Sequence, residues 1–357
     1  MSDEQSTKLA LGTVQLGVPY GAANTTGLPS ESDALRILAV ARELGITQFD
    51  TARAYGLSEE RIGLAVSQHI LNDVHVITKI DHALLTRLHE SKADDEDVQS
   101  GVQEAGDVAT TGHTEEAGTS FAEKLVDASV HESLRRLQLP VLPVLLLHKW
   151  EQRDAAWQRM VHWRDSRKRV RQLGTSTYYP EQVIEALSDA DVKHIQLPLN
   201  LLDWRWRPGH EAGGADVGEQ LYSALAQRSD VCIHARSAYL QGILVCSEER
   251  WPQFARDDGT AACVLAALDS LVARLGRKSR ADLCLSYVRS LPWVSAVLVG
   301  AETEAQLRDN VELCKATALT ASERTVVETA LPRVSIRVLD PSQWEVNPTI
   351  AGSYRKK

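Results

Sequence analysis

Four titratable side chains stand where apolar runs of the sequence end. Asp50 closes the run TQFD, and Tyr55 lies in the loop that follows. Lys79 closes VHVITK, and His148 closes VLPVLLLH. Taken singly, each fits a hydrogen-bonded structural role. A carboxylate, a phenol, an ammonium and an imidazole brought together can hold and transfer a proton, so the set favours an acid–base active site.

The elements that must position these residues follow from the alternation of the chain. Short apolar runs alternate with longer amphipathic stretches, which is typical of parallel βα units. Eight strands are expected, the number of a closed α/β barrel of the (β/α)8 or TIM type, and 357 residues can form it as a single domain over 1–357. Active sites of such barrels lie at the carboxyl ends of the strands, so the four side chains should meet there. The expected strands are 9–13, 47–50, 74–79, 141–148, 170–174, 194–196, 231–235 and 296–299.

Helices are expected between the strands, where apolar residues recur at three and four positions. The first has Ser30 as a suitable cap and Gly45 as a stop. The other expected helices are 58–69, 121–137, 180–187, 218–227, 262–275 and 303–314.

Residues 82–120 interrupt this alternation after the third strand. The segment is polar and acidic, with few large apolar residues after Leu88, so it cannot bury a core of its own. We expect a flexible insertion within the barrel. A tolerated surface excursion and a lid or partner arm over the site both remain open.

Composition excludes several classes of protein. The net charge of −9 disfavours a nucleic-acid partner. Five cysteines without a CxxC pair argue against a disulfide framework and a zinc site, and indicate a reducing cytoplasm. The histidines beyond His148, among them His194 and His234, show no metal-ligand spacing, so no metal is expected. Neither a secretory signal nor a membrane span fits the sequence.

The residues around the acid and the tyrosine resemble a known family. FDTARAYGLSEERIG, from Phe49 to Gly63, is similar to the signature of the aldo-keto reductases, and VITK and LLLH are similar to the strands that supply their lysine and histidine. The likeness runs from LALGTVQLG to VLVGAETEAQLRDNV and leaves out the 82–120 insertion. It implies an NAD(P)(H)-dependent enzyme that reduces an aldehyde or ketone to an alcohol.

The resemblance also implies a role for each of the four residues. Tyr55 would be the general acid, and the ammonium of Lys79 would lower the pKa of its phenol, which is ordinarily near 10. Asp50 would keep Lys79 charged and in place. His148 would hydrogen-bond the substrate carbonyl.

The cofactor implied is NADP(H) or NAD(H), bound across the barrel mouth, and the absence of a GxGxxG stretch agrees with this. By resemblance, Gly12 and Thr13 approach the nicotinamide ribose, and Ser176 and Gln196 hold the carboxamide. Arg236 stands where many members have a tyrosine that stacks on the ring, and a guanidinium can stack too. The candidate cofactor residues are Gly12, Thr13, Ser176, Gln196, Arg236, Ser237, Gly300, Glu302, Gln306, Asp309 and Asn310.

The segment VGAETEAQLRDN departs from the family pattern. Members specific for NADPH carry basic residues here, whereas this chain has Gly300, Glu302 and Gln306, with Arg308 as the only cation. A carboxylate repels a 2′-phosphate but accepts hydrogen bonds from a ribose hydroxyl. Use of NAD(H) is therefore an open alternative.

The partner expected is a small-molecule carbonyl compound, with a sugar-derived one as a candidate. Trp204 and Trp206 in NLLDWRWRPG follow the sixth strand, where a substrate wall is expected; a surface loop anchored by two aromatic residues explains them equally well. Two other functions stay open: the reverse reaction as an aldose or alcohol dehydrogenase, and a non-catalytic nucleotide-binding scaffold or sensor. The sequence does not indicate the oligomeric state.

Overall fold

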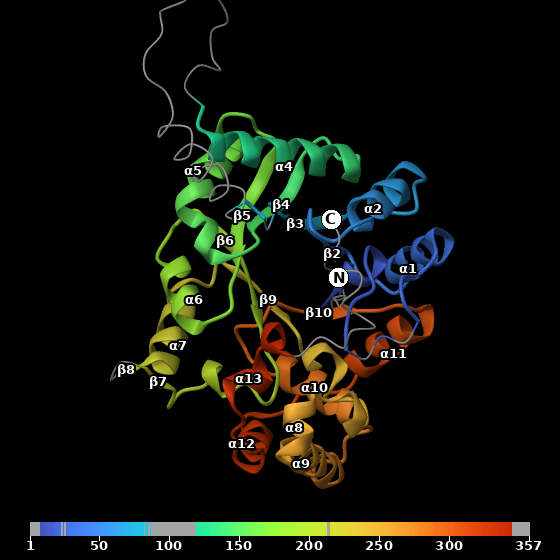
Figure 1. Ribbon diagram of the computed structural model, residues 1–357, viewed down its shortest axis with the longest axis vertical. Helices are drawn as coiled ribbons and strands as arrows, with labels where there is room; N and C mark the ends of the chain where they lie inside the picture. Colours follow the sequence, from blue (N-terminus) through green and yellow to red (C-terminus); the bar gives the residue numbers. More distant parts are fainter. Residues whose placement is uncertain are drawn as a thin grey trace, which may run out of the picture.

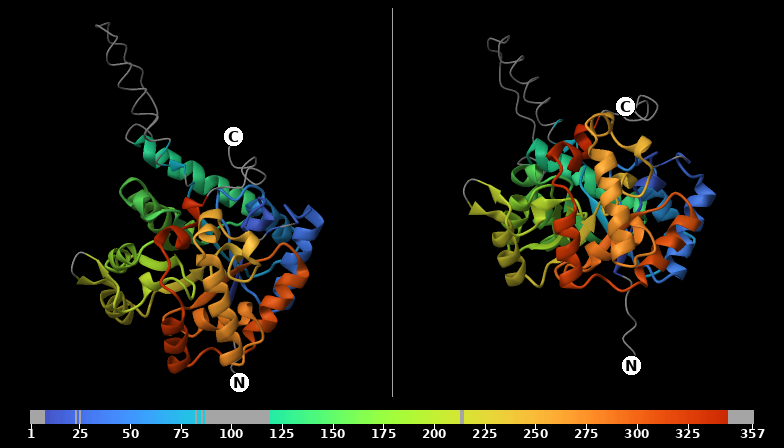
Figure 2. Two further views of the ribbon diagram at one scale, coloured as in Figure 1. Left: turned by 60° about the horizontal axis from the view of Figure 1, so that its bottom comes forward. Right: turned by 90° about the horizontal axis from the view of Figure 1, so that it is seen from below.

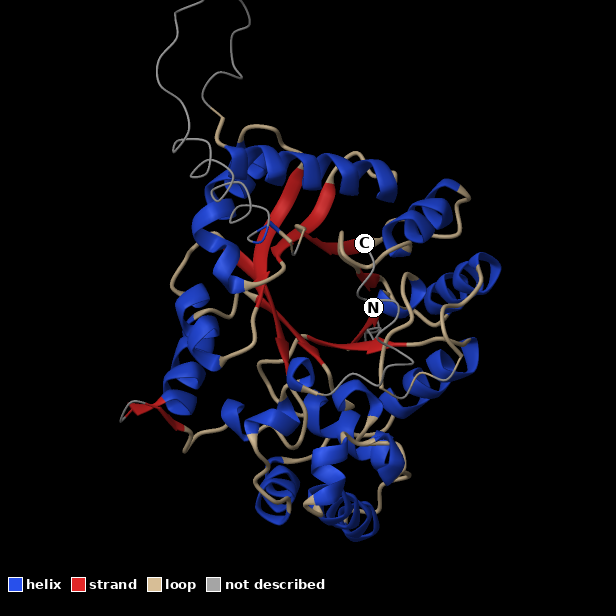
Figure 3. Ribbon diagram, in the orientation of Figure 1, coloured by secondary structure: helices blue, strands red, loops and turns tan. Residues whose placement is uncertain are grey.

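Eight parallel strands close into a barrel (Figures 1 and 3). The computed structural model describes residues 8–22, 24, 26–81, 83–84, 86, 119–212 and 215–344. The order around the barrel is β1-β10-β9-β6-β5-β4-β3-β2, and each neighbouring pair is parallel. This confirms the expected TIM barrel, and each expected strand is present. The barrel strands are β1 (Leu9–Gly12), β2 (Gln48–Asp50), β3 (His75–Lys79), β4 (Leu142–Leu147), β5 (Val170–Ser176), β6 (Val192–Pro198), β9 (Cys232–Arg236) and β10 (Ala296–Gly300).

Helices surround the barrel on all sides in Figure 1 and in the two further views of Figure 2. Those of the outer ring are α1 (Glu31–Glu43), α2 (Ser58–Ser67), α4 (Phe121–Leu137), α5 (Arg153–Asp165), α6 (Pro180–Leu187), α7 (Val217–Gln227), α10 (Arg280–Arg289) and α11 (Glu304–Cys314).

Further helices extend one side of the ring, near the bottom of Figure 1. α8 (Gln253–Asp257) and α9 (Thr260–Arg274) precede α10, while α12 (Ala321–Ala330) and α13 (Ile336–Leu339) follow α11. A short antiparallel hairpin, β7 (Glu211–Ala212) with β8 (Ala215–Asp216), precedes α7. The 3-10 turns are η1 (Val14–Leu16), η2 (Trp150–Gln152), η3 (Trp204–Trp206), η4 (Leu240–Gly242), η5 (Glu248–Arg250) and η6 (Pro341–Gln343).

Local signals account for the ends of the helices. The hydroxyl of Ser30 accepts a hydrogen bond from the backbone N–H of Asp33 and caps α1, as the sequence predicts. Gly45, just after that helix, has φ of +81°, a left-handed conformation that glycine adopts without strain. Ser120 and Glu123 form a capping box that starts α4.

The helix α10 was not expected, because it lacks a polar face. Its residues from Asp282 to Val288 are all buried between the barrel and neighbouring helices, so apolar and polar positions do not alternate with a helical period. The helix α5 was not expected either, for a different reason. Its four buried residues stand among many charged neighbours, so their helical spacing is hard to recognise in the sequence.

The barrel interior is filled by side chains on the inner face of the strands. Ile77, Val144 and Leu146 form one small cluster there, separate from the main core between strands and helices. Alternation along each strand then places Lys79 and His148 above this apolar layer, at the carboxyl end.

Most of the acidic insertion lies outside the described residues. Of 82–120, the structure describes 83–84, 86 and 119–120. The expectation that this segment is flexible, and its two alternative roles, therefore stay predictions. Among the described residues, no helix is both long and apolar enough to cross a bilayer.

Candidate active site

A cavity of about 530 Å³ opens at the carboxyl ends of the strands. Asp50, Tyr55 and His148 line it together. The cofactor candidates that also line it are Gly12, Ser176, Gln196, Arg236, Ser237, Gly300, Glu302, Gln306, Asp309 and Asn310. Residues from every part of the sequence thus meet at one cavity, as the barrel topology requires.

Lys79 lies directly behind the cavity wall, with its side chain 1% exposed. Its Nζ donates to Asp50 Oδ1 at 2.6 Å and to the backbone oxygen of Thr51 at 2.9 Å. Gln196 Nε2 donates to the same Asp50 oxygen at 2.8 Å. Burial lowers the pKa of Lys79, and the Asp50 carboxylate opposes this by favouring the charged ammonium.

The Tyr55 ring lies close to both this ion pair and His148. Lys79 Nζ is 5.0 Å from the centroid of the Tyr55 ring. The ring centroids of Tyr55 and His148 are 5.8 Å apart, and the rings meet edge to face at 85°. A phenol flanked by an ammonium and an imidazole is suited to giving up and regaining a proton.

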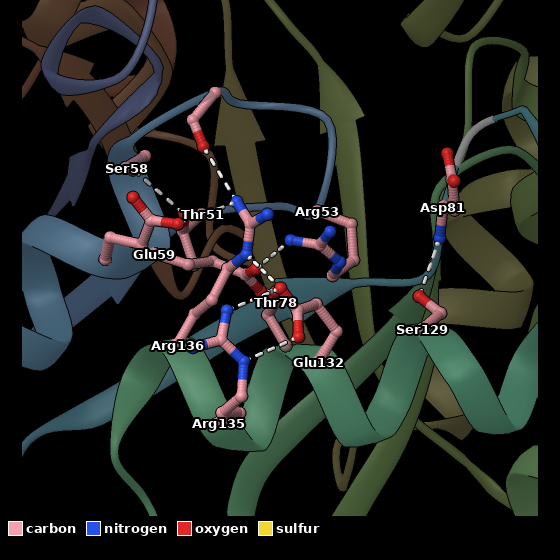
Figure 4. A network of polar contacts seen from close by, with 12 residues as sticks. Thr51, Arg53, Ser58, Glu59, Thr78, Asp81, Ser129, Glu132, Arg135 and Arg136 are labelled. Carbon is pink, nitrogen blue, oxygen red and sulfur yellow. Dashed lines mark hydrogen bonds and ion pairs between the residues drawn. The ribbon is translucent and has the colours of Figure 1, made fainter.

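A buried carboxylate fixes the loop that carries Tyr55 (Figure 4). Glu59, whose side chain is 1% exposed, accepts a hydrogen bond from Arg53 at 2.7 Å and from the hydroxyl of Thr78 at 2.8 Å. Arg53 belongs to the Tyr55 loop, and Thr78 precedes Lys79 in β3. Glu59 therefore ties the strand that holds the lysine to the loop that holds the tyrosine.

The first loop of the barrel packs against the same segment. An ideal Cβ at Gly17 would lie 1.7 Å from the backbone oxygen of Tyr55, so only glycine fits at this close approach. Leu57 N also donates to the Gly17 oxygen at 3.3 Å. Sequence analysis missed Gly17 and Glu59 as positioning residues, because their effect depends on contacts between loops.

We predict that Glu59→Gln lowers kcat by about tenfold and leaves nucleotide affinity unchanged, since Arg53 and Thr78 donate to different oxygens of Glu59, one of which becomes an amide nitrogen that cannot accept, and only the geometry of Tyr55 and Lys79 changes. Steady-state kinetics and a nucleotide titration check this. Glu60→Gln, at the neighbouring and exposed carboxylate that pairs with Arg136 at 3.3 Å, is the matched control and should retain wild-type kcat. Equal activity of both variants would contradict the role given to Glu59.

Thr13 is not among the residues that line the cavity, and its assignment as a cofactor residue stays a prediction. Its side chain is fully buried. The hydroxyl donates to the backbone oxygen of Asp50 at 2.7 Å and lies 2.6 Å from the hydroxyl of Ser58. Thr13 thus braces the end of β2.

The two tryptophans after β6 are not among the residues that line this cavity, and their assignment as substrate residues stays a prediction. Trp206 is 1% exposed, and its indole N–H donates to Asp203 at 3.0 Å. The Trp204 indole N–H donates to the backbone oxygen of Val334 at 2.9 Å, and the Arg333 guanidinium lies 3.8 Å from its ring centroid. Both rings anchor the loop and the C-terminal segment.

The far end of the cavity is formed by β10 and α11. Glu302 lines it, while Arg308 points away and lies 3.7 Å from Glu43 and 3.9 Å from Glu304. The side-chain oxygen of Gln306 accepts from the backbone N–H groups of Glu302 and Thr303 and closes a capping box at the helix start. Among the described residues that line the cavity, Arg236 is the only lysine or arginine.

Several lining residues were missed by sequence analysis, among them Tyr20, Tyr178 and Gln241. They lie in loops without periodic patterns. Gln241 donates to the Tyr20 hydroxyl at 3.4 Å, and burial raises the pKa of Tyr20 to about 12, with the nearby Tyr55 adding to the rise. The Arg236 guanidinium lies 4.6 Å from the Tyr178 ring centroid.

The cavity offers groups that suit a nicotinamide cofactor. Gln15 lines it beside Gly300, and its buried side-chain oxygen has no hydrogen-bond partner within the described part of the chain. An orphaned acceptor of this kind fits a ribose hydroxyl or an amide donor. Ser176 and Gln196 add a hydroxyl and an amide deeper in the cavity.

Comparison with known proteins agrees with the resemblance of the sequence motifs. A model of the aldo/keto reductase family matches residues 8–331. The D-threo-aldose 1-dehydrogenase of a Pseudomonas species is 31% identical over 157 residues, and the match covers 42% of this chain and 45% of that protein. The chain thus spans less than half the length of that relative. The uncharacterized oxidoreductase YqkF of Bacillus subtilis (strain 168) is 23% identical over 334 residues, or 88% of this chain and 94% of YqkF.

Solved structures show the same fold. The aldo-keto reductase AKR11C1 from Bacillus halodurans, in its holo form, has a TM-score of 0.64 and 22% identity, covering 94% of this chain and 95% of that one. The glycerol dehydrogenase AKR11B4 from Gluconobacter oxydans has a TM-score of 0.62 and 20% identity, covering 97% and 96%.

Proposed function

Because the chain belongs to the aldo/keto reductase family, we propose that it is a nicotinamide-dependent oxidoreductase that interconverts a small carbonyl compound and its alcohol. The observation that carries the proposal is the arrangement of Tyr55 beside the buried Lys79–Asp50 pair, with His148 in edge-to-face contact with the same ring. All four side chains have the types that carbonyl reduction needs.

Each of these residues has a distinct task in the proposed reaction. Tyr55 donates its phenolic proton to the oxygen of the forming alkoxide. The Lys79 ammonium stabilises the phenolate that this leaves, and Asp50 keeps that ammonium charged in its buried position. His148 orients the carbonyl oxygen toward Tyr55. When bound, a reduced nicotinamide supplies the hydride to the carbonyl carbon.

The residues that would hold the cofactor line the same cavity. Ser176 and Gln196 would bind the carboxamide, with Gly12 allowing close approach of the ribose. Arg236 and Tyr178 offer planar groups beside it. Glu302, Asp309 and the start of α11 would meet the adenosine end.

We infer a preference for NAD(H) over NADP(H) from the residues at the adenosine end of the cavity. Glu302 lines the cavity, and Arg308 is turned toward Glu43 and Glu304. A carboxylate accepts hydrogen bonds from a 2′-hydroxyl and repels a 2′-phosphate.

We predict that Glu302→Arg shifts the ratio of NADPH to NADH affinity by about 10- to 100-fold toward NADPH. The reason is that the Glu302 carboxylate repels the 2′-phosphate of NADPH, whereas an arginine near the surface attracts it. Tryptophan fluorescence titrations with both nucleotides measure it. Glu312→Arg makes the same charge change at an exposed position of α11, next to Lys315, and is the matched control. An unchanged ratio in Glu302→Arg would place the ribose elsewhere.

The substrate class we propose is a polyhydroxylated carbonyl or alcohol, such as an aldose. Two of the similar proteins are named as an aldose and a glycerol dehydrogenase, which supports this class. The same residues serve reduction and oxidation, because the Tyr55 phenolate can also accept the alcohol proton. Assays of aldoses with NAD⁺ and of aldehydes with NADH, run side by side, test both the class and the direction.

A further inference from the structure

Two barrel strands bring two histidines and a cysteine together inside the barrel, away from the proton-transfer residues. His194 lies on β6, and Cys232 and His234 lie on β9. In the register of this strand pair, His194 is opposite Cys232, and Gln196 is opposite His234. The ring nitrogens and the sulfur all lie within 4.8 Å of one another.

These three side chains share the inner face of the barrel. Gln196 and Arg236 line the active-site cavity, and side chains two residues apart on a strand point to the same side. On this inner face, His194 and His234 are therefore the next side chains after Gln196 and Arg236 toward the amino-terminal end of the barrel. Cys232 is the next one after His234. The expectation that these histidines have no metal-ligand spacing was wrong, because Cys232 and His234 stand two apart on one strand face.

The two imidazoles lack partners for their polar atoms. His194 is 1% exposed and His234 is 0% exposed. None of their four ring nitrogens has a hydrogen-bond partner within the part of the chain that the structure describes. The rings meet edge to face, with centroids 4.3 Å apart. Buried polar atoms without partners are costly and rare, so this cluster indicates a ligand that satisfies them.

We propose that His194, Cys232 and His234 bind one zinc ion. Imidazole nitrogens and cysteine thiolates are the ligands that zinc prefers in proteins, and a water would complete the four-coordinate site. Zinc bonds of about 2.0–2.3 Å place ligand atoms roughly 3.5 Å apart, so small side-chain rotations close the site. On binding, a Zn–S bond replaces the S–H bond of Cys232, and the thiol proton leaves to solvent.

The location inside the barrel, below Gln196 and Arg236, indicates an ion that stabilises the strand pair and does not touch the proton-transfer residues. Cys232 is the half-buried member of the set and begins β9, so an ion enters from the amino-terminal end of the barrel, opposite the active-site mouth. His75 on β3 and Lys79 are the nearby basic groups, and the charge of Lys79 is paired with Asp50. The ion would tie β6 to β9, the strand pair that also supplies Gln196 and Arg236.

The test uses the full-length chain, stripped with a chelator under reducing conditions and titrated with Zn²⁺ alone in competition with a chromophoric chelator. We expect one equivalent of zinc and a higher thermal midpoint of unfolding when it is bound. Cys232→Ser replaces the sulfur by an oxygen and should weaken zinc binding by well over tenfold. Mutations of residues that only hydrogen-bond a metal ligand already weaken metal binding by about tenfold or more, and Cys232 is itself a ligand. His234→Gln should do the same. Cys263→Ser, at an exposed cysteine, should bind as the wild type does.

The absorption spectrum of the Co²⁺-bound protein is a second measurement, and it does not depend on protein stability. Co²⁺ bound by the wild type should give a sulfur-to-metal charge-transfer band, and Cys232→Ser should lack it. A wild-type protein that binds less than a tenth of an equivalent of zinc would overturn the proposal. So would one equivalent retained by both Cys232→Ser and His234→Gln.

Discussion

Tyr55→Phe should lower kcat by about 10²- to 10⁴-fold, the contribution that a positioned general acid makes, while nucleotide affinity stays near the wild-type value. The substitution removes one hydroxyl and keeps the ring that contacts Lys79 and His148. Steady-state kinetics with the best carbonyl substrate, together with a fluorescence titration of the nucleotide, separate the loss of the proton donor from a loss of binding.

Tyr20→Phe is the matched control, since Tyr20 lines the same cavity. Burial raises the pKa of Tyr20 to about 12, which makes it a poorer acid than an ordinary phenol. This variant should keep most of its turnover. A large loss in Tyr20→Phe with little loss in Tyr55→Phe would reverse the assignment of the proton donor.

Asp50→Asn should destabilise the protein by about 3–5 kcal/mol, because it leaves the buried Lys79 ammonium without its carboxylate. Turnover should fall as well. Burial already lowers the pKa of Lys79, and without the opposing effect of Asp50 that pKa falls further, so less ammonium remains to stabilise the Tyr55 phenolate. Urea unfolding and kcat, measured on the same preparations, check both effects.

The double variant Asp50→Asn, Lys79→Met separates the two effects. Removing both charges should recover much of the lost stability, since no unpaired charge remains buried, while turnover stays low. An Asp50→Asn protein that unfolds at the wild-type urea midpoint would show that the pair contributes little to the folded state.

The strands and the titratable residues at their carboxyl ends could be predicted because their signals are local. An apolar run that ends in a single titratable residue marks both a strand and its carboxyl end, as at Lys79 and His148. The helix α10 could not be predicted in this way, because it is buried on every side. For α5 the apolar positions exist but are diluted by charged neighbours.

Where the structure differs from what the sequence suggests, the surroundings of the residues are set by tertiary contacts. Thr13 and Trp206 stand at positions that suggest the cavity, yet their polar atoms are bonded to Asp50 and Asp203 beneath the surface. The cluster of His194 with His234 depends on the pairing of β6 with β9, which no spacing in the sequence reveals. Tyr20 reaches the cavity from a loop, so it carries no periodic signal.

The most direct test of the central claim is a fluorescence titration of the purified protein with NADH and with NADPH, for which its eight tryptophans supply a signal. We predict saturable binding of one nucleotide per chain in the micromolar range, tighter for NADH than for NADPH. Binding of neither nucleotide would contradict the proposed oxidoreductase, because the acid–base residues at the barrel mouth would then have no hydride source.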